Sequence, residues 1–401
     1  MIKYLGSKRV LVPVLGAMAA ATGARTAVDL FTGTTRVAQE FKRLGMAVTA
    51  SDLATYAEVL ARCYIATDAR AVDAAALADE IDRLNALPGR PGYVTRTFCE
   101  EARYFQPANG ARIDAIRDAI EADHGPGAPA SGRPRAGAGA DEGAPSSSSM
   151  GRGTAAAPHD PLYPILLTSL MEAADRVDST TGQQMAYLKQ WAARASNPLR
   201  LRAPELLPGA GRAIRGDARE VARTLPPVDL AYLDPPYNQH RYFGNYHVWE
   251  TLIRWDAPET YGIARKRVDA RDPSTGSDFN RRREMPPALG QVIRDVRAGV
   301  VMVSYNDESW IDVPTLAAFL RDAGHAEVRV LGFDSKRYVG AQIGIYSPAG
   351  RRVGQVGRLR NTEYVFVAGP REQVEAAVAA GQAAGGEVVP VVEGGSPGSV
   401  S

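Results

Sequence analysis

The chain has 401 residues, 45% of them hydrophobic and 23% charged, and its formal net charge at pH 7 is only +2. These totals are ordinary for a soluble globular protein of two or three domains, or of one large domain with insertions. They exclude a strong overall electrostatic field, and the lack of any run of about 20 apolar residues excludes a membrane-spanning helix.

The cysteines and histidines predict neither disulfides nor a structural metal. Cys63 and Cys99 form no CxxC pair, which is typical of a reducing compartment, and the five histidines lack metal-ligand spacing. The apolar stretch KRVLVPVLGAMAAATGA (8–24) is similar to a signal peptide, but it is short, interrupted by Pro13 and followed at once by a strand pattern. We therefore expect a cytoplasmic protein.

Strand and helix patterns alternate along much of the chain. A buried strand at 25–31 is followed by a helix at 36–45, a strand at 46–52 and a helix at 55–66. The alternation then resumes with a helix at 313–324 and with strands at 227–234, 298–307, 325–335 and 361–369. Continuous apolar strands that alternate with helices predict an α/β fold, a doubly wound parallel sheet with helices on both faces.

The segment between residues 53 and 216 has a different character. It is mostly helical by period, including 161–177 and 182–195, and favours a long domain inserted into the sheet. Within it, 27 of the 35 residues at 124–158 are Gly, Ala, Pro or Ser, which predicts a disordered loop. The end of the chain, from about 384, has the composition of a frayed tail.

The first strand leads into a turn with the features of a nucleotide site. Gly33 lies in this turn, and Asp52 ends the next strand 19 residues later, in the position of an acid that binds ribose hydroxyls. Thr35 and Ala38 stand where a dinucleotide loop has glycines, so a nucleoside without phosphates fits better; a plain helix-entry turn is the alternative. Asp217 follows a later strand, as a second ligand-side acid or as a turn or N-cap residue.

The motif D-P-P-Y (234–237) suits the capture of an exocyclic amine. Asp234 ends a strand, Pro235 and Pro236 hold the neighbouring carbonyls still, and Tyr237 offers a ring for stacking. The carboxylate and the Pro235 carbonyl can each accept one N–H, which leaves the nitrogen lone pair directed at an electrophile. S-adenosylmethionine fits as the methyl donor, and a structural turn at the strand end is the alternative.

These motifs resemble the N6-adenine-specific DNA methyltransferases of the D12 class, the DNA adenine methylase family. The resemblance includes KYLGSK (3–8), the loop FTGTT (31–35) and NTEYVFV (361–367). It implies methylation of N6 of a flipped-out adenine at specific sites in duplex DNA. It assigns catalysis to Asp234, Pro235, Pro236 and Tyr237, and cofactor binding to Tyr4, Lys8, Asp29, Phe31, Gly33, Asp52, Asp217 and Asp234.

The resemblance also implies a domain layout. Residues 1–59 and 206–370 form the two parts of a Rossmann-like methyltransferase domain, 60–205 form an inserted target-recognition domain, and 371–401 form a helix and a flexible tail. The implied partner is double-stranded DNA, with a cognate restriction endonuclease as an open possibility. We expect no membrane partner and favour a monomer.

Aromatic and basic residues after the motif are candidates for DNA contacts. Tyr242, Phe243 and Tyr246 are candidates for the wall of the base pocket, although Phe243 and Trp249 fit equally well as packing beneath it. The seven Lys and Arg residues of 265–283 are candidates for phosphate contacts, with a partly ion-paired loop as the alternative. A hairpin at 335–346 is a weaker candidate.

Two other functions stay open at this point. Cytosine N4 in DNA or guanine N2 in ribosomal RNA would use the same four residues, because each is an exocyclic amine. The helical insert favours DNA over RNA, and Asp234 favours adenine over cytosine. A DNA-binding relative without catalysis is the other alternative, and the intact D-P-P-Y motif argues against it.

Overall fold

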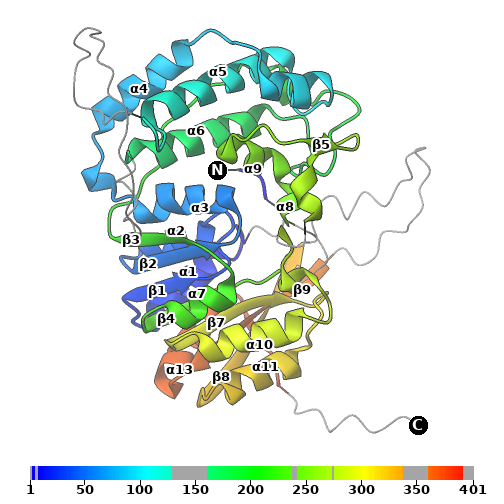
Figure 1. Cartoon of the computed structure of the whole chain (residues 1–401). Coiled ribbons are helices and arrows are strands. Elements are labelled where there is room, and N and C mark those ends of the chain that lie inside the picture. Colours follow the sequence, from blue (N-terminus) through cyan, green and yellow to red (C-terminus); the bar gives the residue numbers. More distant parts are fainter. Residues whose placement is uncertain are drawn as a thin grey trace, which may run out of the picture.

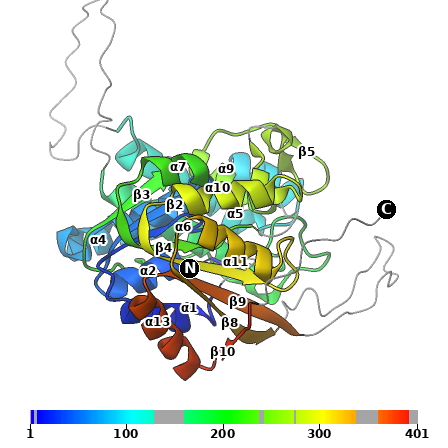
Figure 2. The same cartoon turned by 90° about the horizontal axis from the view of Figure 1, so that it is seen from below.

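A computed structural model of the chain describes residues 2–4, 8–128, 160–236, 242–272, 275–336 and 360–391. Its centre is an eight-stranded sheet in the order β10-β8-β9-β7-β4-β1-β2-β3 (Figures 1 and 2). The strands are β1 Thr26–Asp29, β2 Ala47–Asp52, β3 Gly211–Arg215, β4 Val228–Leu233, β7 Ala298–Asn306, β8 Glu327–Lys336, β9 Arg360–Gly369 and β10 Glu387–Val388. The predicted α/β class is confirmed.

The sheet is mostly, but not wholly, parallel. Strands β3, β2, β1, β4 and β7 are parallel, whereas β9 runs antiparallel to both of its neighbours, β7 and β8. The prediction of a parallel sheet is therefore wrong at β9. Its apolar run encodes burial on both faces, which a central strand needs in either direction. Within the stretch from 384 expected to fray, Glu387–Val388 form β10, which pairs antiparallel with β8 at the sheet edge; residues 392–401 lie outside the described residues.

Helices cover both faces of the sheet (Figure 2). One face packs against α1 Val12–Ala21, α2 Arg36–Arg43 and α13 Arg371–Ala383. The other packs against α7 Ala218–Thr224, α10 Met285–Asp295 and α11 Val313–Asp322. Successive strand residues serve opposite faces: Ala27 belongs to the first core and Val28 to the second.

The signal-like stretch at 8–24 forms α1 and belongs to the core. Leu15 and Met18 are fully buried, and the helix packs between α2 and α13. Among the described residues, no helix is long and apolar enough to cross a membrane.

The segment between β2 and β3 is helical, as predicted. It comprises α3 Thr55–Ala61, a π-helical turn Arg62–Ala66, α4 Ala74–Ala86, a second π-helical turn Thr95–Glu100, α5 Pro107–His124 and α6 Leu162–Val177. These helices lie above the β3 edge of the sheet in Figure 1. The predicted disordered loop falls almost entirely on residues 129–159, which lie outside the described residues.

The predicted helix at 182–195 is wrong. Residues 178–192 take an irregular path, and only Ala193–Ser196 form a short 3₁₀ turn. Contacts with distant parts of the chain hold this path: Gln184 N donates to Asn245 O at 2.7 Å, and Ser179 N donates to Tyr104 O at 2.8 Å. These long-range bonds override the local helical period.

Two further segments after β4 pack against the insert. They are the short helices α8 Tyr242–Asn245 and α9 His247–Arg254, and a hairpin of β5 Thr260–Tyr261 and β6 Lys266–Arg267. Helix α9 contacts both α3 and α6, and Figure 1 shows it beside α6. The insert, which precedes the D-P-P-Y motif in the sequence, is therefore in contact with α9, which follows the motif.

The insert is joined to the sheet by a close seam at β3. The buried ammonium of Lys42 donates to the carbonyls of Ile65 at 2.8 Å and Thr67 at 2.6 Å, which satisfies the end of the first π-helical turn. Gly211 lies against the same turn, where a Cβ would come within 2.3 Å of the Ile65 oxygen. Only a glycine fits there, because the obstacle is backbone.

We predict that Gly211→Ala destabilises the fold. The added methyl would push β3 away from the Ile65 carbonyl, and overpacking of this kind costs about 1–3 kcal/mol. Thermal unfolding should show a lower midpoint for this variant. Gly127→Ala is the matched control, because a Cβ at Gly127 meets nothing within 4 Å. Equal unfolding midpoints for the two variants would show that Gly211 is not closely packed against the Ile65 carbonyl.

Candidate active site

A cavity of about 490 Å³ lies at the carboxyl ends of β1, β2 and β4. The chain proceeds from β1 to β2 in one direction and from β4 to β7 in the other, so the cavity lies at the point where the strand order reverses. Open α/β sheets bind ligands at this point. Seven of the predicted site residues line the cavity: Tyr4, Phe31, Asp52, Asp217, Asp234, Pro235 and Pro236.

Asp52 and Gly33 form the predicted turn. One carboxylate oxygen of Asp52 accepts from Gly33 N at 2.9 Å and the other from Ala54 N at 3.0 Å. Burial raises the pKa of Asp52 in spite of these two bonds. Gly33 has φ of +49°, and a Cβ there would lie 3.1 Å from the Tyr4 ring, so both conformation and space require glycine.

Tyr4 forms part of a stack of three tyrosine rings. Its centroid lies 5.5 Å from that of Tyr242 and 4.7 Å from that of Tyr246. Tyr242 and Phe243 line the cavity, as predicted, but Tyr246 is fully buried beneath Tyr4 and does not. Trp249 is also fully buried, so the packing interpretation holds for that residue.

Asp217 is both an N-cap and a cavity residue. Its carboxylate accepts from Arg219 N at 2.9 Å, which caps α7, and also pairs with the Arg219 side chain at 3.0 Å. Arg219 in turn pairs with Asp278 at 2.8 Å. The carboxylate is therefore fixed at the rim of the cavity by the first turn of α7.

Asp234 follows β4 directly and is paired with Lys8. The Lys8 ammonium lies 3.2 Å from Asp234 Oδ1 and 3.0 Å from an oxygen of Glu363 on β9. Burial raises the pKa of Asp234 to about 6, an effect that Lys8 partly offsets and Glu363 reinforces. Tyr237, the last residue of the predicted motif, lies outside the described residues.

Asp29 lies behind the cavity rather than on its wall. It is 1% exposed, and its carboxyl accepts from Phe31 N at 3.3 Å, which shapes the start of the loop after β1. Burial raises the pKa of Asp29 to about 8, and the nearby carboxylates of Asp234 and Asp52 add to the shift. Three acids at the ends of adjacent strands thus share one desolvated region.

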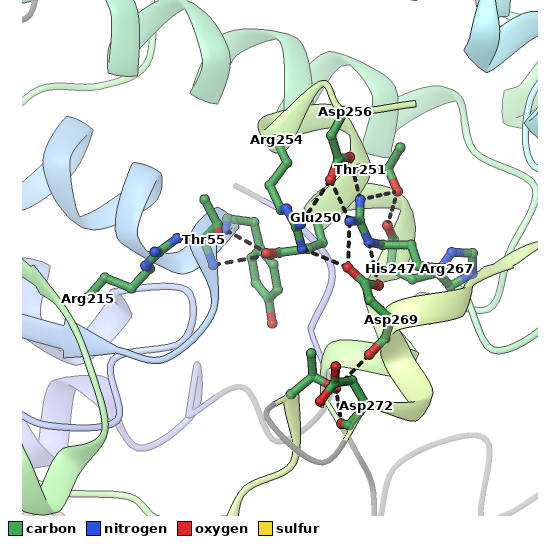
Figure 3. A network of polar contacts seen from close by, with 12 residues as sticks. Thr55, Arg215, His247, Glu250, Thr251, Arg254, Asp256, Arg267, Asp269 and Asp272 are labelled. Atoms are coloured by element: carbon green, nitrogen blue, oxygen red, sulfur yellow. Dashed lines mark hydrogen bonds and ion pairs between the residues drawn. The ribbon is translucent and has the colours of Figure 1, made fainter. Parts of the chain in front are cut away.

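Glu250 is a cavity residue that the sequence analysis missed. Its carboxylate accepts from Thr55 N at 3.1 Å and Tyr56 N at 3.3 Å, at the start of α3 (Figure 3). Burial raises the pKa of Glu250. Its partners are 195 and 194 residues away in the sequence, so no local motif could have revealed it.

Three of the seven basic residues predicted to contact phosphates, Arg265, Arg267 and Arg281, form ion pairs in the described structure. Arg267 is buried and pairs with Asp256 at 2.6 Å and Asp269 at 2.7 Å, while Arg254 joins the same two acids (Figure 3). Arg265 pairs with Glu101 at 3.3 Å. The phosphate interpretation is wrong for Arg267, and the ion-paired loop describes it instead. Residues 337–346 of the predicted hairpin lie outside the described residues.

The described residues contain no group of three His, Cys, Asp or Glu side chains that could hold a metal ion. Cys63 and Cys99 are buried free thiols, and burial raises the pKa of Cys63 to about 12. Neither thiol lines the cavity.

A mostly parallel α/β sheet with this cavity and Asp-Pro-Pro at the end of β4 has the architecture of a Rossmann-like methyltransferase. Residues 4–275 match the family described as D12 class N6 adenine-specific DNA methyltransferase. The chain belongs to this family and is a DNA methyltransferase that takes its methyl group from a donor.

Curated relatives are type II and modification methylases. Type II methyltransferase M.NlaIII of Neisseria lactamica is 29% identical over 291 residues, which cover 71% of this chain and 76% of that protein. Type II methyltransferase M.CviAII of Paramecium bursaria Chlorella virus 1 is 27% identical over 75% of this chain and 81% of its own length. Modification methylase StsI of Streptococcus sanguinis is 26% identical over 80% of this chain, which spans only 46% of that protein. No solved structure matches the chain.

We predict that Asp29→Asn stabilises the protein increasingly as the pH rises. The carboxyl has a pKa of about 8 when folded, against 3.8 in the reference state, so the native protein holds a proton that the unfolded chain loses. This lowers the free energy of unfolding between about pH 4 and 8, by up to about 1.4 kcal/mol per pH unit. Asparagine removes the titration and can still accept from Phe31 N.

Urea denaturation of both proteins at pH 5, 6.5 and 8 measures this effect. The difference in unfolding free energy between variant and wild type should grow with pH. Asp82→Asn, on an exposed position of α4, is the control and should show a constant difference. A constant difference for Asp29→Asn as well would show that the carboxyl is ionised in the native protein.

Proposed function

We propose that the protein transfers a methyl group from S-adenosylmethionine to N6 of a flipped-out adenine at specific sites in duplex DNA. The observation that carries this proposal is the position of Asp234, Pro235 and Pro236 on the wall of a cavity that also contains Asp52 and Asp217. The carboxylate of the amine-binding motif and the acids of the nucleoside side therefore face one space.

The cavity fits the donor in size and chemistry. Its volume of about 490 Å³ lies within the usual range for small-ligand pockets, and acids and aromatic rings line it together. Asp52 and Asp217 would accept from the ribose and adenine of the nucleoside, and the Phe31 ring would pack against it. S-adenosylmethionine would supply an electrophilic methyl carbon at the Asp234 end.

Asp234 would orient the target amine. With a pKa of about 6, its carboxylate is mostly ionised at neutral pH and can accept an N–H of the amine, while the rigid Pro235 carbonyl accepts the other. Oδ1 is buried and lies 3.2 Å from the Lys8 ammonium, whose charge and hydrogen bonding lower the pKa of Asp234. An acceptor held in this way strengthens as positive charge develops on the nitrogen.

The insert and the β5–β6 hairpin would form the DNA-reading side. The Tyr104 hydroxyl of the insert lies 2.7 Å from Gln184 O and 2.8 Å from Ala264 O, and thereby ties the hairpin to residues 60–205. Ile263, next to this tie, is 82% exposed at the tip of the hairpin. An exposed apolar residue of this kind can fill the gap that an everted base leaves.

The relatives' names suggest the biological setting. They are type II and modification methylases, so we propose that a cognate restriction endonuclease recognises the same DNA sequence. We propose that the protein acts as a monomer, because each transfer modifies one strand, and that it acts in the cytoplasm, where DNA and donor meet.

The proposed reaction can be tested with tritium-labelled methyl donor and duplex DNA. Digestion of the labelled product to nucleosides should give N6-methyladenosine in its deoxy form. Label in N4-methylcytosine would refute the assignment of the base, and transfer to ribosomal RNA instead of DNA would refute the assignment of the substrate. No transfer to either would leave a DNA-binding protein without catalysis.

We predict that Asp234→Ala lowers the transfer rate by several orders of magnitude and leaves DNA binding largely intact. The loss follows because both acceptance of the amine hydrogen and the charge near the nitrogen disappear. Single-turnover transfer and DNA binding by fluorescence anisotropy measure the two effects. Asp322→Ala, exposed at the end of α11, should behave as wild type. A near-normal rate for Asp234→Ala would show that another group holds the amine.

A further inference from the structure

Asp234, Lys8 and Glu363 form a charged triad built from three distant parts of the chain. Lys8 precedes α1, Asp234 follows β4 and Glu363 lies on β9. The Lys8 ammonium contacts both carboxylates, Asp234 at 3.2 Å and Glu363 at 3.0 Å. The side chains are largely buried: Lys8 is 6% exposed, Asp234 19% and Glu363 16%. Solvent therefore screens these interactions weakly.

The two contacts of Lys8 differ in kind. The ammonium donates a hydrogen bond to Glu363 Oε2 at 3.0 Å, whereas its contact with Asp234 Oδ1 is longer, at 3.2 Å, and poorly aligned, although hydrogen bonding by Lys8 still lowers the pKa of Asp234. Glu363 therefore directs the ammonium, and Asp234 experiences its charge while keeping acceptor capacity. A carboxylate fully hydrogen-bonded to an ammonium would be a poorer acceptor for a neutral amine.

Both supports of the Lys8 ammonium are rigid. Glu363 lies on a strand that is hydrogen-bonded on both sides, opposite Asn306 of β7 and Phe333 of β8. The Lys8 carbonyl accepts from Leu11 N at 2.7 Å and Val12 N at 2.8 Å, which fixes the lysine backbone at the start of α1. Neither partner needs to move when a ligand enters the cavity.

We propose that Glu363 is a positioning residue for the methyl-transfer reaction: it holds the Lys8 ammonium so that Asp234 stays ionised yet able to accept the target amine. The inference rests on the proposed function for the role of Asp234. It assigns a task to a residue that lies outside the D-P-P-Y motif and is not among the residues that line the cavity.

The charged and titratable groups around Asp234 determine the direction in which each variant should shift its pKa. Lys8 of the N-terminal segment favours the ionised form, whereas burial and Glu363 of β9 disfavour it. Asp29 of β1, with a pKa of about 8, holds a proton at the pH where Asp234 titrates. Tyr232 of β4 also interacts with the carboxylate, but burial raises its pKa well above the ordinary value, so it stays neutral. Removing one charge of the triad should therefore move the Asp234 pKa in a direction set by that charge.

Two single variants should shift the pH profile of kcat/KM in opposite directions. Wild-type activity should fall as the pH drops through about 6, where Asp234 takes up a proton. Glu363→Gln removes a negative charge and should move this acid limb to lower pH by about half a unit to one unit. Lys8→Gln removes the cation and should move it to higher pH by about one unit or more.

The value of kcat at pH 8, above the acid limb, distinguishes a positioning role of Glu363 from a purely electrostatic one. Glu363→Gln should lower kcat by about tenfold at pH 8, because Lys8, no longer shared with a second carboxylate, then bonds Asp234 more strongly and weakens it as an acceptor. In the Lys8→Gln background, Glu363→Gln should cause little further loss of kcat, and the acid limb should return toward the wild-type position. Lys8→Arg should restore part of the activity, since it retains the cation.

Glu327→Gln is the matched control. Glu327 lies on the neighbouring strand β8 and pairs with Arg329 away from the cavity. The same substitution there should leave both kcat and the pH profile unchanged. A merely structural role for Glu363 would lower the unfolding midpoint of Glu363→Gln without moving the acid limb, and this result would overturn the proposal.

An NMR titration of the Asp234 carboxyl carbon keeps this test independent of the proposed function. The titration needs neither DNA nor methyl donor, so it applies even if the wild-type protein transfers no methyl group. The midpoint should fall in Glu363→Gln and rise in Lys8→Gln. Unchanged midpoints in both variants would refute the triad itself, whereas shifted midpoints without methyl transfer would refute only the assigned reaction.

Discussion

The site depends on the burial of several carboxylates at the ends of neighbouring parallel strands. Asp29, Asp52 and Asp234 lie at or just beyond the ends of β1, β2 and β4, and burial raises the pKa of each. Desolvated negative charges so close together are unfavourable, and the structure offsets this cost in a different way for each carboxylate. Asp52 accepts two backbone N–H groups, Asp234 faces an ammonium, and the pKa of about 8 keeps Asp29 mostly protonated at neutral pH. These differences give chemically identical side chains distinct tasks.

The same electrostatic constraint explains why the N-terminal segment must return to the sheet. The ends of β1 and β2 beside Asp234 carry acids, and the cation at Asp234 comes from the N-terminal segment. Lys8 supplies it from the turn before α1, and Tyr4 of the same segment stacks on Tyr246 and closes over Gly33. The short N-terminal stretch therefore contacts both Asp234 and the Gly33 turn.

The parts of the site that are local in sequence could be predicted, and the parts that arise from distant contacts could not. The turn at Gly33, the acid Asp52 and the strand before Asp234 follow from strand patterns and their spacing, because each is set within about 20 residues. Glu250 depends on partners 194 and 195 residues away, which the local sequence does not identify. The partners of Arg267, Asp256 and Asp269, lie within 11 residues of it, and the sequence left the ion-paired loop open as one of two interpretations. The predictions of a parallel strand at β9 and of a helix at 182–195 were wrong for the same reason. The hydrophobic period of a segment encodes which residues are buried, but not which other segment they pack against.

The ion pairs of the loop after α9 connect the cavity to the β5–β6 hairpin. Arg254 lines the cavity and pairs with Asp256 and Asp269, and Arg267 at the base of the hairpin pairs with the same two acids. Such a network adds little stability, because desolvation of the charges offsets much of their attraction, but its directional bonds allow few alternative arrangements. The hairpin is therefore held at a fixed position relative to Glu250 and the cavity wall. Under the proposed function, this connection would keep a DNA-reading hairpin in register with the pocket that receives the everted base.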